Sequence, residues 1–311
     1  MKTYLSAIVF LFAYTSAFAQ QLPLFTQYRE YSGILNPAAV PNDYLWYEKN
    51  LSFGASYRKQ WLNDSEGPAT QVIRGDYVWL RDNVHPIFGG YLMNDKAARM
   101  GMTGAYGRMG ILFSDSPLER GISAGLSAGV VRYGLDLNNP RVEDPSDPAL
   151  FDVRNKIFPD VSAGVYAYTT FDNGHLLYGG ASVPQVLGLD LRFRDKSDNT
   201  LSLQRSQHFY ATAGYKISLR DEYSFLEFST WVKYVPALKP HFDCNVRYQM
   251  SETLFIGTGM SSSGNFHIET GLLMGEDKLF RIGMGADVPF TRTSAYYGAA
   301  LEFNCAYALE R

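Results

Sequence analysis

Five histidines are the residues of this sequence whose side chains most readily bind a metal ion or move a proton near neutral pH. They are His85, His175, His208, His241 and His267. No two of them stand in an H-x-x-x-H spacing, which would place two imidazoles on one helix face around a zinc ion. The sequence therefore predicts no metal site.

Serine hydrolysis is the next chemistry to test, because His267 follows Ser261, Ser262 and Ser263 and precedes Glu269 by two residues. Such an enzyme needs a nucleophilic serine, a histidine base and an acid that orients the base. No G-x-S-x-G turn surrounds these serines. We interpret His267 as a histidine that faces a polar interior beside a serine-rich turn, and no catalytic residue is predicted.

Glycine-rich runs are a third candidate, because a glycine loop that precedes a helix can cradle phosphate groups. Gly283-Met284-Gly285 and residues 125–129 are such runs, but no helical pattern follows either of them. Glycines that relieve crowding within strands explain both runs better. The sequence predicts no cofactor, and the chain is not expected to be an enzyme.

Charged residues of both signs alternate with apolar residues in the second half of the chain. In a sheet this alternation places all the charges on one face. They could line a path for solutes or form a neutralised ladder that fixes a plugged barrel, and the sequence leaves both readings open. The residues are Glu227, Lys233, Asp243, Arg247, Glu269, Arg281, Asp287 and Glu302.

The elements that must position these side chains are strands. Phe242, Cys244 and Val246 alternate with Asp243 and Asn245, and a similar two-residue period recurs along most of the chain. The candidate strands are residues 51–58, 69–80, 85–94, 100–113 and 121–137, the two arms of residues 158–185, and residues 209–219, 226–234, 241–250, 254–260, 266–274, 279–290 and 297–309.

A soluble sandwich of two sheets would show the same alternation. Three features favour a membrane barrel: the strands are long, their polar faces carry charges and glycines, and tyrosine or phenylalanine recurs near the strand ends. We therefore predict an all-β fold, an antiparallel transmembrane β-barrel of the bacterial outer membrane with roughly 14 strands.

The clearest hairpin lies at residues 158–185, where two alternating arms flank Asn173-Gly174. Asn-Gly favours a two-residue turn in which both central residues take positive φ. Barrels place such short turns on the periplasmic side. The proline- and aspartate-rich residues 138–157 are then predicted to form a long outward loop.

The N-terminus has the pattern of a secretory signal peptide: Lys2, an apolar run, and Ala17-Phe18-Ala19 before Gln20. We predict a signal peptide at 1–19, an irregular leader at 20–50 and the barrel at 51–311, located in the cell outer membrane. The net charge of −3, from 28 basic and 31 acidic residues, offers no electrostatic footprint for nucleic acid. Outer-membrane lipid is the expected surrounding.

Cys244 and Cys305 are the two cysteines of the chain. Both fall on the apolar, lipid-facing side of strands far apart in sequence. A disulfide requires Cα atoms within about 7 Å of each other. The sequence therefore predicts two free thiols.

Several short strings, spread over nearly the whole mature chain, together resemble the PorP/SprF family of the Bacteroidota type IX secretion system. The order and spacing of these strings carry the resemblance. They are Gln27-Tyr28, Leu35-Asn36-Pro37-Ala38, Tyr57-Arg58-Lys59-Gln60-Trp61, Asn94-Asp95, Phe158-Pro159-Asp160-Val161-Ser162-Ala163-Gly164 and Tyr178-Gly179-Gly180-Ala181-Ser182-Val183.

The resemblance implies an outer-membrane barrel without enzymatic activity that serves the export or surface display of cargo with a C-terminal sorting domain. It also implies work beside the periplasmic ring proteins PorK and PorN and the peptidoglycan-binding lipoprotein PorE. The chain resembles the secretion and assembly branch of the family more than the members paired with one gliding-motility adhesin. The alternative is a plugged outer-membrane channel for small or hydrophobic solutes.

Because a barrel commits its wall to lipid and has no free edge, partner contacts must come from the leader, turns or loops. We therefore expect residues 20–50 to shape a periplasmic or lumenal contact surface. The second interpretation is that the strings in and beside the leader only begin and brace the barrel.

Overall fold

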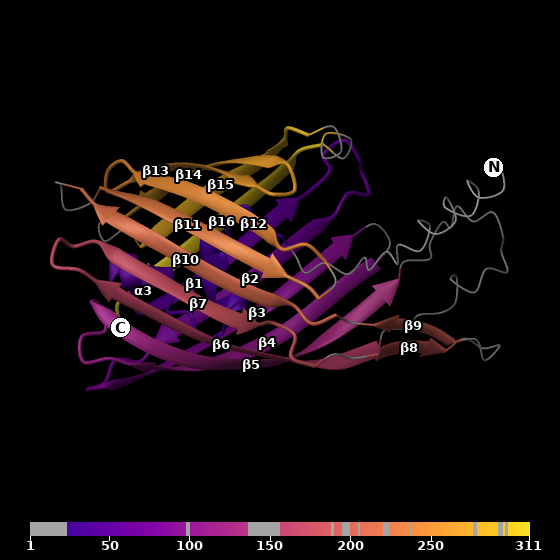
Figure 1. Cartoon of the computed structure of the whole chain (residues 1–311), viewed down its shortest axis with the longest axis horizontal. Helices are drawn as coiled ribbons and strands as arrows, with labels where there is room; N and C mark the ends of the chain where they lie inside the picture. The colour runs from indigo at the N-terminus through magenta and orange to yellow at the C-terminus, as the bar shows by residue number, and fades with distance from the viewer. Residues whose placement is uncertain are drawn as a thin grey trace, which may run out of the picture.

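The computed structural model is a closed, fourteen-stranded antiparallel barrel whose N-terminal leader lies inside the lumen (Figure 1). It describes residues 24–97, 100–135, 156–187, 190–194, 200–204, 206–219, 224–236, 238–275, 279–291, 295 and 298–311. The predicted signal peptide lies outside these residues. None of the described helices is long and apolar enough to cross a membrane.

The barrel follows the chain as a meander, each strand pairing with the next, and β1 closes the sheet by pairing with β16. The barrel strands are β1 (Leu51–Lys59), β2 (Ala69–Val78), β3 (Val84–Ala97), β4 (Met100–Phe113), β5 (Arg120–Leu135), β6 (Lys156–Thr170), β7 (Leu176–Val183), β10 (Phe209–Ser218), β11 (Phe225–Tyr234), β12 (His241–Gln249), β13 (Leu254–Ser261), β14 (Asn265–Met274), β15 (Phe280–Pro289) and β16 (Ala300–Leu309).

The predicted fold class is confirmed, and each predicted barrel strand corresponds to one strand of the structure. The bounds differ by a few residues: β6 begins at Lys156, within the segment predicted to be a loop, and β16 begins at Ala300 rather than at residue 297. Residues 138–155 of that predicted loop lie outside the described part of the chain.

Sequence inspection missed one element. Between β7 and β10 a separate two-stranded sheet, β8 (Asp190–Arg194) with β9 (Thr200–Gln204), lies beyond one end of the barrel (Figure 1). We call that end the loop end, since the β1–β2 connection lies there and β5 and β7 end there. The opposite end, where β2–β3, β4–β5 and β6–β7 turn, is the turn end.

The predicted hairpin at residues 158–185 is β6 and β7, but its turn is not the two-residue type. Phe171 N–H donates to the His175 carbonyl, which leaves three residues in the loop, and Gly174 N–H donates to Phe171. Only Gly174 has positive φ, at 75°, whereas Asn173 does not. The pairing of Thr170 with Leu176 sets this longer loop, for which a type I turn followed by a left-handed glycine is the usual solution.

Alternation along the strands separates a lipid-facing wall from the lumen. In β14, for example, Ile268 and Leu272 point outward and are about half exposed, while His267 and Glu269 are buried in the lumen. The same period holds around the barrel, because one face meets lipid and the other meets the leader.

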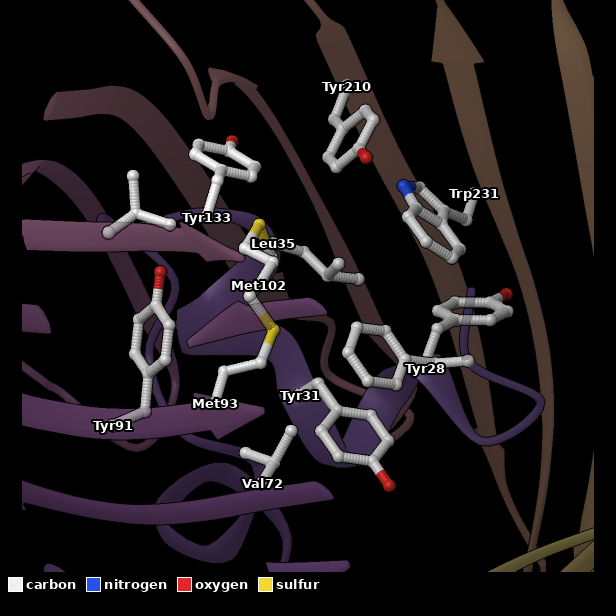
Figure 2. Close-up of a cluster of buried hydrophobic side chains, with 12 residues drawn as sticks. Tyr28, Tyr31, Leu35, Val72, Tyr91, Met93, Met102, Tyr133, Tyr210 and Trp231 are labelled. Atoms are coloured by element: carbon white, nitrogen blue, oxygen red, sulfur yellow. The ribbon is translucent and has the colours of Figure 1, made fainter. Parts of the chain in front are cut away.

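The leader is folded into three short helices inside the barrel: η1 (Tyr28–Tyr31), α2 (Ser32–Leu35) and α3 (Asn42–Tyr47). Its apolar residues form two buried clusters with wall residues. One of them joins Tyr28, Tyr31 and Leu35 to side chains from opposite sides of the wall (Figure 2). The wall residues labelled there are Val72, Tyr91, Met93, Met102, Tyr133, Tyr210 and Trp231.

Cys244 and Cys305 are free and exposed, on β12 and β16, as predicted. We expect the chain unfolded in non-reducing detergent to take up two equivalents of a maleimide, because neither thiol is oxidised. The same two equivalents should be measured by mass spectrometry after reduction. Labelling that appears only after reduction would contradict the free-thiol assignment.

Candidate functional site

A cluster of buried charged residues lies where the leader meets β11 to β15. Arg29 forms ion pairs with Glu269 and, at 3.5 Å, with Glu227. Glu30 Oε1 lies 3.2 Å from Arg247 Nη1, and the Glu30 carboxylate also forms an ion pair with Arg281. The leader thereby supplies both an anion and a cation to a wall that carries both.

Arg281 is shared between two leader carboxylates, since it also pairs with Asp43 at 2.6 Å. Burial alone would raise the pKa values of the Glu30 and Asp43 carboxyls, but the neighbouring arginines hold both pKa values below their usual range. Both groups are therefore charged at neutral pH. A buried charge is costly to leave unpaired, so this arrangement ties leader and wall together.

A second charged node forms beside Thr26, at the entry of the leader. Glu302 is fully buried and accepts the Thr26 N–H at 2.7 Å and the Gln27 N–H at 3.2 Å. Arg58 of β1 lies between Asp287 and Glu302 and also donates to the Thr26 hydroxyl. Strands β1, β15 and β16 thus hold the beginning of the leader through hydrogen bonds to the Thr26 and Gln27 backbone and to the Thr26 hydroxyl.

On the other side of the lumen, wall residues hold the leader through hydrogen bonds to its backbone carbonyls and to the Asn36 side chain. The Asn36 Nδ2 donates to the Val165 carbonyl at 2.9 Å, and the Leu35 carbonyl accepts from Ser182 Oγ at 2.6 Å. Arg108 donates to the Pro37 and Ala39 carbonyls, at 3.1 and 2.9 Å. Wall side chains thereby supply hydrogen-bond donors to the leader carbonyls of Leu35, Pro37 and Ala39.

Three glycines allow the leader backbone to lie close to the wall: Gly125 of β5, Gly164 of β6 and Gly180 of β7. We call these three glycines together with Asn36 the glycine seat. A Cβ at Gly164 would collide with Asn36 Oδ1, and one at Gly125 would collide with the Pro37 carbonyl oxygen. At Gly180 a Cβ would lie 2.6 Å from Asn36 Nδ2. A side chain at any of these three glycine positions would push the leader off the wall.

The glycine seat brings together three strings that are far apart in the sequence. Asn36 and Pro37 come from the leader string, Gly164 ends the string that begins at Phe158, and Gly180 belongs to the string that begins at Tyr178. Sequence reasoning gave each string separately and did not predict their contact.

The remaining predicted site residues are dispersed. Gln27 and Tyr28 are buried in the lumen, where the Tyr28 hydroxyl donates to Ser229 Oγ at 2.8 Å. Gln60 and Trp61 line a cavity of about 320 Å³ at the loop end. Arg58 belongs to the node at Glu302, while Tyr57 points outward.

The other predicted residues lie on β3 and β6. Asn94 is exposed on the outer wall, and Asp95 accepts the Thr70 hydroxyl at 2.6 Å. Asp160 is buried and accepts the Tyr106 hydroxyl at 2.9 Å, Phe158 packs against the cluster of Figure 2, and Pro159 is exposed. These residues do not gather into one site.

Sequence reasoning missed Arg29, Glu30 and Asp43, the leader residues that make the lumenal ion pairs. The available signal was that these three charged residues, of both signs, stand among the aromatic and proline residues of the leader, ahead of Glu48 and Lys49 at its end. The wall charges predicted to face the interior do so, and their pairing matches the neutralised ladder.

The histidine and serine candidates do not assemble a hydrolase. His267 bonds to Asp287 at 2.7 Å and to Asp243 at 3.4 Å. Ser261 instead contacts His241, through the same Nε2 that approaches Asp243, whereas a triad uses the two ring nitrogens separately. In the described ranges, no three histidine, cysteine or acidic residues are placed to hold a metal ion.

Two further serines, Ser123 and Ser127, do stand at the centres of G-x-S-x-G strings. Both lie within β5 and face the lumen, not on the strand-to-helix turn that a nucleophile elbow requires. Ser123 Oγ donates to the Ala38 carbonyl at 2.6 Å, so it holds the leader.

We expect Gly164→Ala to loosen the leader, because the new methyl group cannot share the space of the Asn36 amide. A loss of about 1–3 kcal/mol in the free energy of unfolding is expected, as for other overpacked buried sites. Gly107→Ala is the matched control, since nothing lies within 4 Å of a Cβ there. The measurement is the thermal midpoint of the heat-induced mobility shift. In an Asn36→Gly background, Gly164→Ala should lower the midpoint little further, since the amide with which the methyl group collides is then absent. Equal midpoints for the two alanine variants would refute the seat.

The fold resembles solved outer-membrane channels. A TodX monoaromatic hydrocarbon channel mutant superposes with a TM-score of 0.58 at 8% identity, covering 90% of this chain and 94% of that one. The P. putida toluene transporter TodX superposes with a TM-score of 0.55 at 9% identity, covering 90% of this chain and 94% of that one. The CymD monoaromatic hydrocarbon channel superposes with a TM-score of 0.53 at 8% identity, covering 92% of this chain and 94% of that one. At such identities the likeness establishes the fold alone.

No curated protein matches the chain by sequence. A family model described as "Type IX secretion system membrane protein PorP/SprF" matches residues 17–307, which is nearly the whole chain. The outer-membrane barrel described above is therefore a type IX secretion system membrane protein, and the chain belongs to the PorP/SprF family.

Proposed function

We propose that this chain is a plugged, non-enzymatic barrel that serves type IX secretion as a structural and interaction component, needed for the export or surface display of cargo proteins. The observation that carries the proposal is the leader locked in the lumen, by ion pairs on one side and by the glycine seat on the other. A barrel filled in this way offers its ends, rather than its lumen, to other proteins.

The boundaries at residues 19 and 50 belong to the same proposal: a signal peptide removed after Ala19 and a leader that threads the barrel before β1. In this proposal the turn end faces the periplasm, because short turns mark that side in bacterial barrels. Residues 138–155 then lie on the outer side.

The buried position of Gln27 to Pro37 favours a bracing role for these leader residues over direct contact with a partner. The part of the leader that remains accessible is at the turn end, where Glu48 is exposed after α3. Trp79, Leu80 and Leu118 are exposed in neighbouring turns, and Arg81 lies over the Trp79 ring at 4.8 Å. We propose this turn-end surface for periplasmic partners resembling PorK, PorN and PorE, as in the secretion branch typified by PorP.

Reversing charge at the turn end should weaken partner recovery without unfolding the barrel. We expect Glu48→Arg combined with Arg81→Glu to lower co-purification of ring and peptidoglycan-binding proteins at least about fivefold, since charge complementarity sets partner choice. The measurement is quantitative mass spectrometry of a pull-down from outer membranes. Lys239→Glu, an exposed charge at the loop end, is the control. Equal recovery with both variants would overturn the turn-end assignment.

The alternative is a plugged channel for small or hydrophobic solutes, and the cavity of about 320 Å³ at the loop end favours it. The ion pairs that fill the lumen favour a closed barrel instead.

Planar-bilayer conductance separates these two functions. We expect purified protein to show no steady open pore, because the leader occupies the lumen. A chain lacking residues 24–47, which make the plug, should conduct if it inserts; insertion is checked by protease protection. A steady pore from the intact chain would favour the channel.

A further inference from the structure

A groove on the lipid-facing wall near the loop end is unrelated to the plug. Its volume is about 360 Å³, and strands β2 to β5 with Ile157 of β6 line it. Four strands at about 4.8 Å spacing span about 14 Å, which is broader than one acyl chain. Whatever covers this surface must be a membrane amphiphile or another membrane protein.

The strand register arranges the groove in two rows across the wall. The row nearer the membrane centre is apolar: Ile73 pairs with Leu92, Leu92 with Ala105, and Ala105 with Val130. Ile73, Leu92 and Val130 are each more than half exposed, whereas Ala105 between them is short. The apolar row is therefore a trough with raised edges, the shape that receives an acyl chain.

The row two residues nearer the loop end is polar. Gln71 pairs with Asn94, Asn94 with Thr103, and Thr103 with Arg132. The Thr103 hydroxyl donates to Asn94 Oδ1 at 2.9 Å. All four side chains are exposed on the outer wall, and Arg132 adds a cation. This row includes Asn94, whose string the plug does not explain.

Lys96 continues the outward face of β3 beyond Asn94 and is exposed as well. Along β3, the outward side chains thus change toward the loop end from apolar Leu92, through hydrogen-bonding Asn94, to cationic Lys96. This order matches an amphiphile whose acyl chains lie in the membrane and whose phosphate lies at its surface.

We propose that this groove is a binding site for a phosphorylated glycolipid of the leaflet at the loop end. Its acyl chains lie in the trough over Ala105, its sugar hydroxyls meet the amides of Gln71 and Asn94, and its phosphates meet Arg132 and Lys96. A bound lipid of this kind fixes the barrel's height and neighbours in the membrane without touching the plug.

Native mass spectrometry of the full chain in detergent, titrated with bis-phosphorylated lipid A, tests this site. Arg132→Gln should weaken binding about tenfold, the usual scale for losing one charge-assisted phosphate contact. With dephosphorylated lipid A, Arg132→Gln and the wild-type chain should bind equally. Ala105→Trp, which fills the trough, should weaken binding of both lipid forms.

Matched controls are Lys239→Gln and Ala211→Trp, an exposed cation and an outward alanine outside the groove. The thermal mobility shift confirms that each variant is folded. Wild-type affinity in both groove variants, or equal losses in the controls, would overturn the proposal. A photoreactive residue at position 105 should cross-link lipid in cells; cross-linking to a protein instead would also overturn it.

Discussion

Charge that is buried in the lumen and cannot be left unpaired is the constraint on which the rest of this structure depends. Arg281 has both its described ion-pair partners, Glu30 and Asp43, in the leader. Glu227 is fully buried and pairs with Arg29. Since an uncompensated buried charge costs several kcal/mol, a wall without the leader would leave these groups unpaired. A leader without the wall would leave its three buried charges, Arg29, Glu30 and Asp43, unpaired. Wall and plug therefore stabilise each other.

The two sides of the lumen hold the leader by different physics. On the charged side, ion pairs to Arg29, Glu30 and Asp43 are strong but tolerate small shifts, because long side chains can follow. On the side of the glycine seat, the leader lies directly against the strands: Asn36 donates to the Val165 carbonyl, and a Cβ at Gly164 would collide with Asn36, so a small shift is not tolerated there. The charged side thus makes loss of the leader costly, because it would leave buried charges unpaired, and the glycine seat sets the position of the leader.

The two-residue period predicted the barrel strands and the inward charges, because a strand exposes alternate residues to lipid whatever its neighbours are. The leader could not be placed in the same way. Its contacts join residues far apart in the chain, such as Asn36 with Val165 at a separation of 129 residues, and no local pattern encodes them. The predicted type of the β6–β7 turn was wrong, because Asn173-Gly174 permits a two-residue turn but the pairing of Thr170 with Leu176 decides the length of the loop. The strings of the family resemblance include Asn36, Gly164 and Gly180 of the glycine seat, but only the fold shows that these residues meet.

Opening the lumen would require both sides to release together. Breaking one buried pair costs about 3–5 kcal/mol, so losing the pairs that the leader makes with Arg281 and with Glu269 would cost about 6 kcal/mol or more, which corresponds to an open population below about 10⁻⁴. Spontaneous opening at that level is too rare to serve as a transport path unless a ligand or partner supplies new pairs for the exposed charges. A partner that only touches the turn end leaves Glu30, Asp43 and Glu302 paired, and so can bind the barrel with the plug in place. The closed lumen and an interaction surface at its ends are in this sense two consequences of the same buried charges.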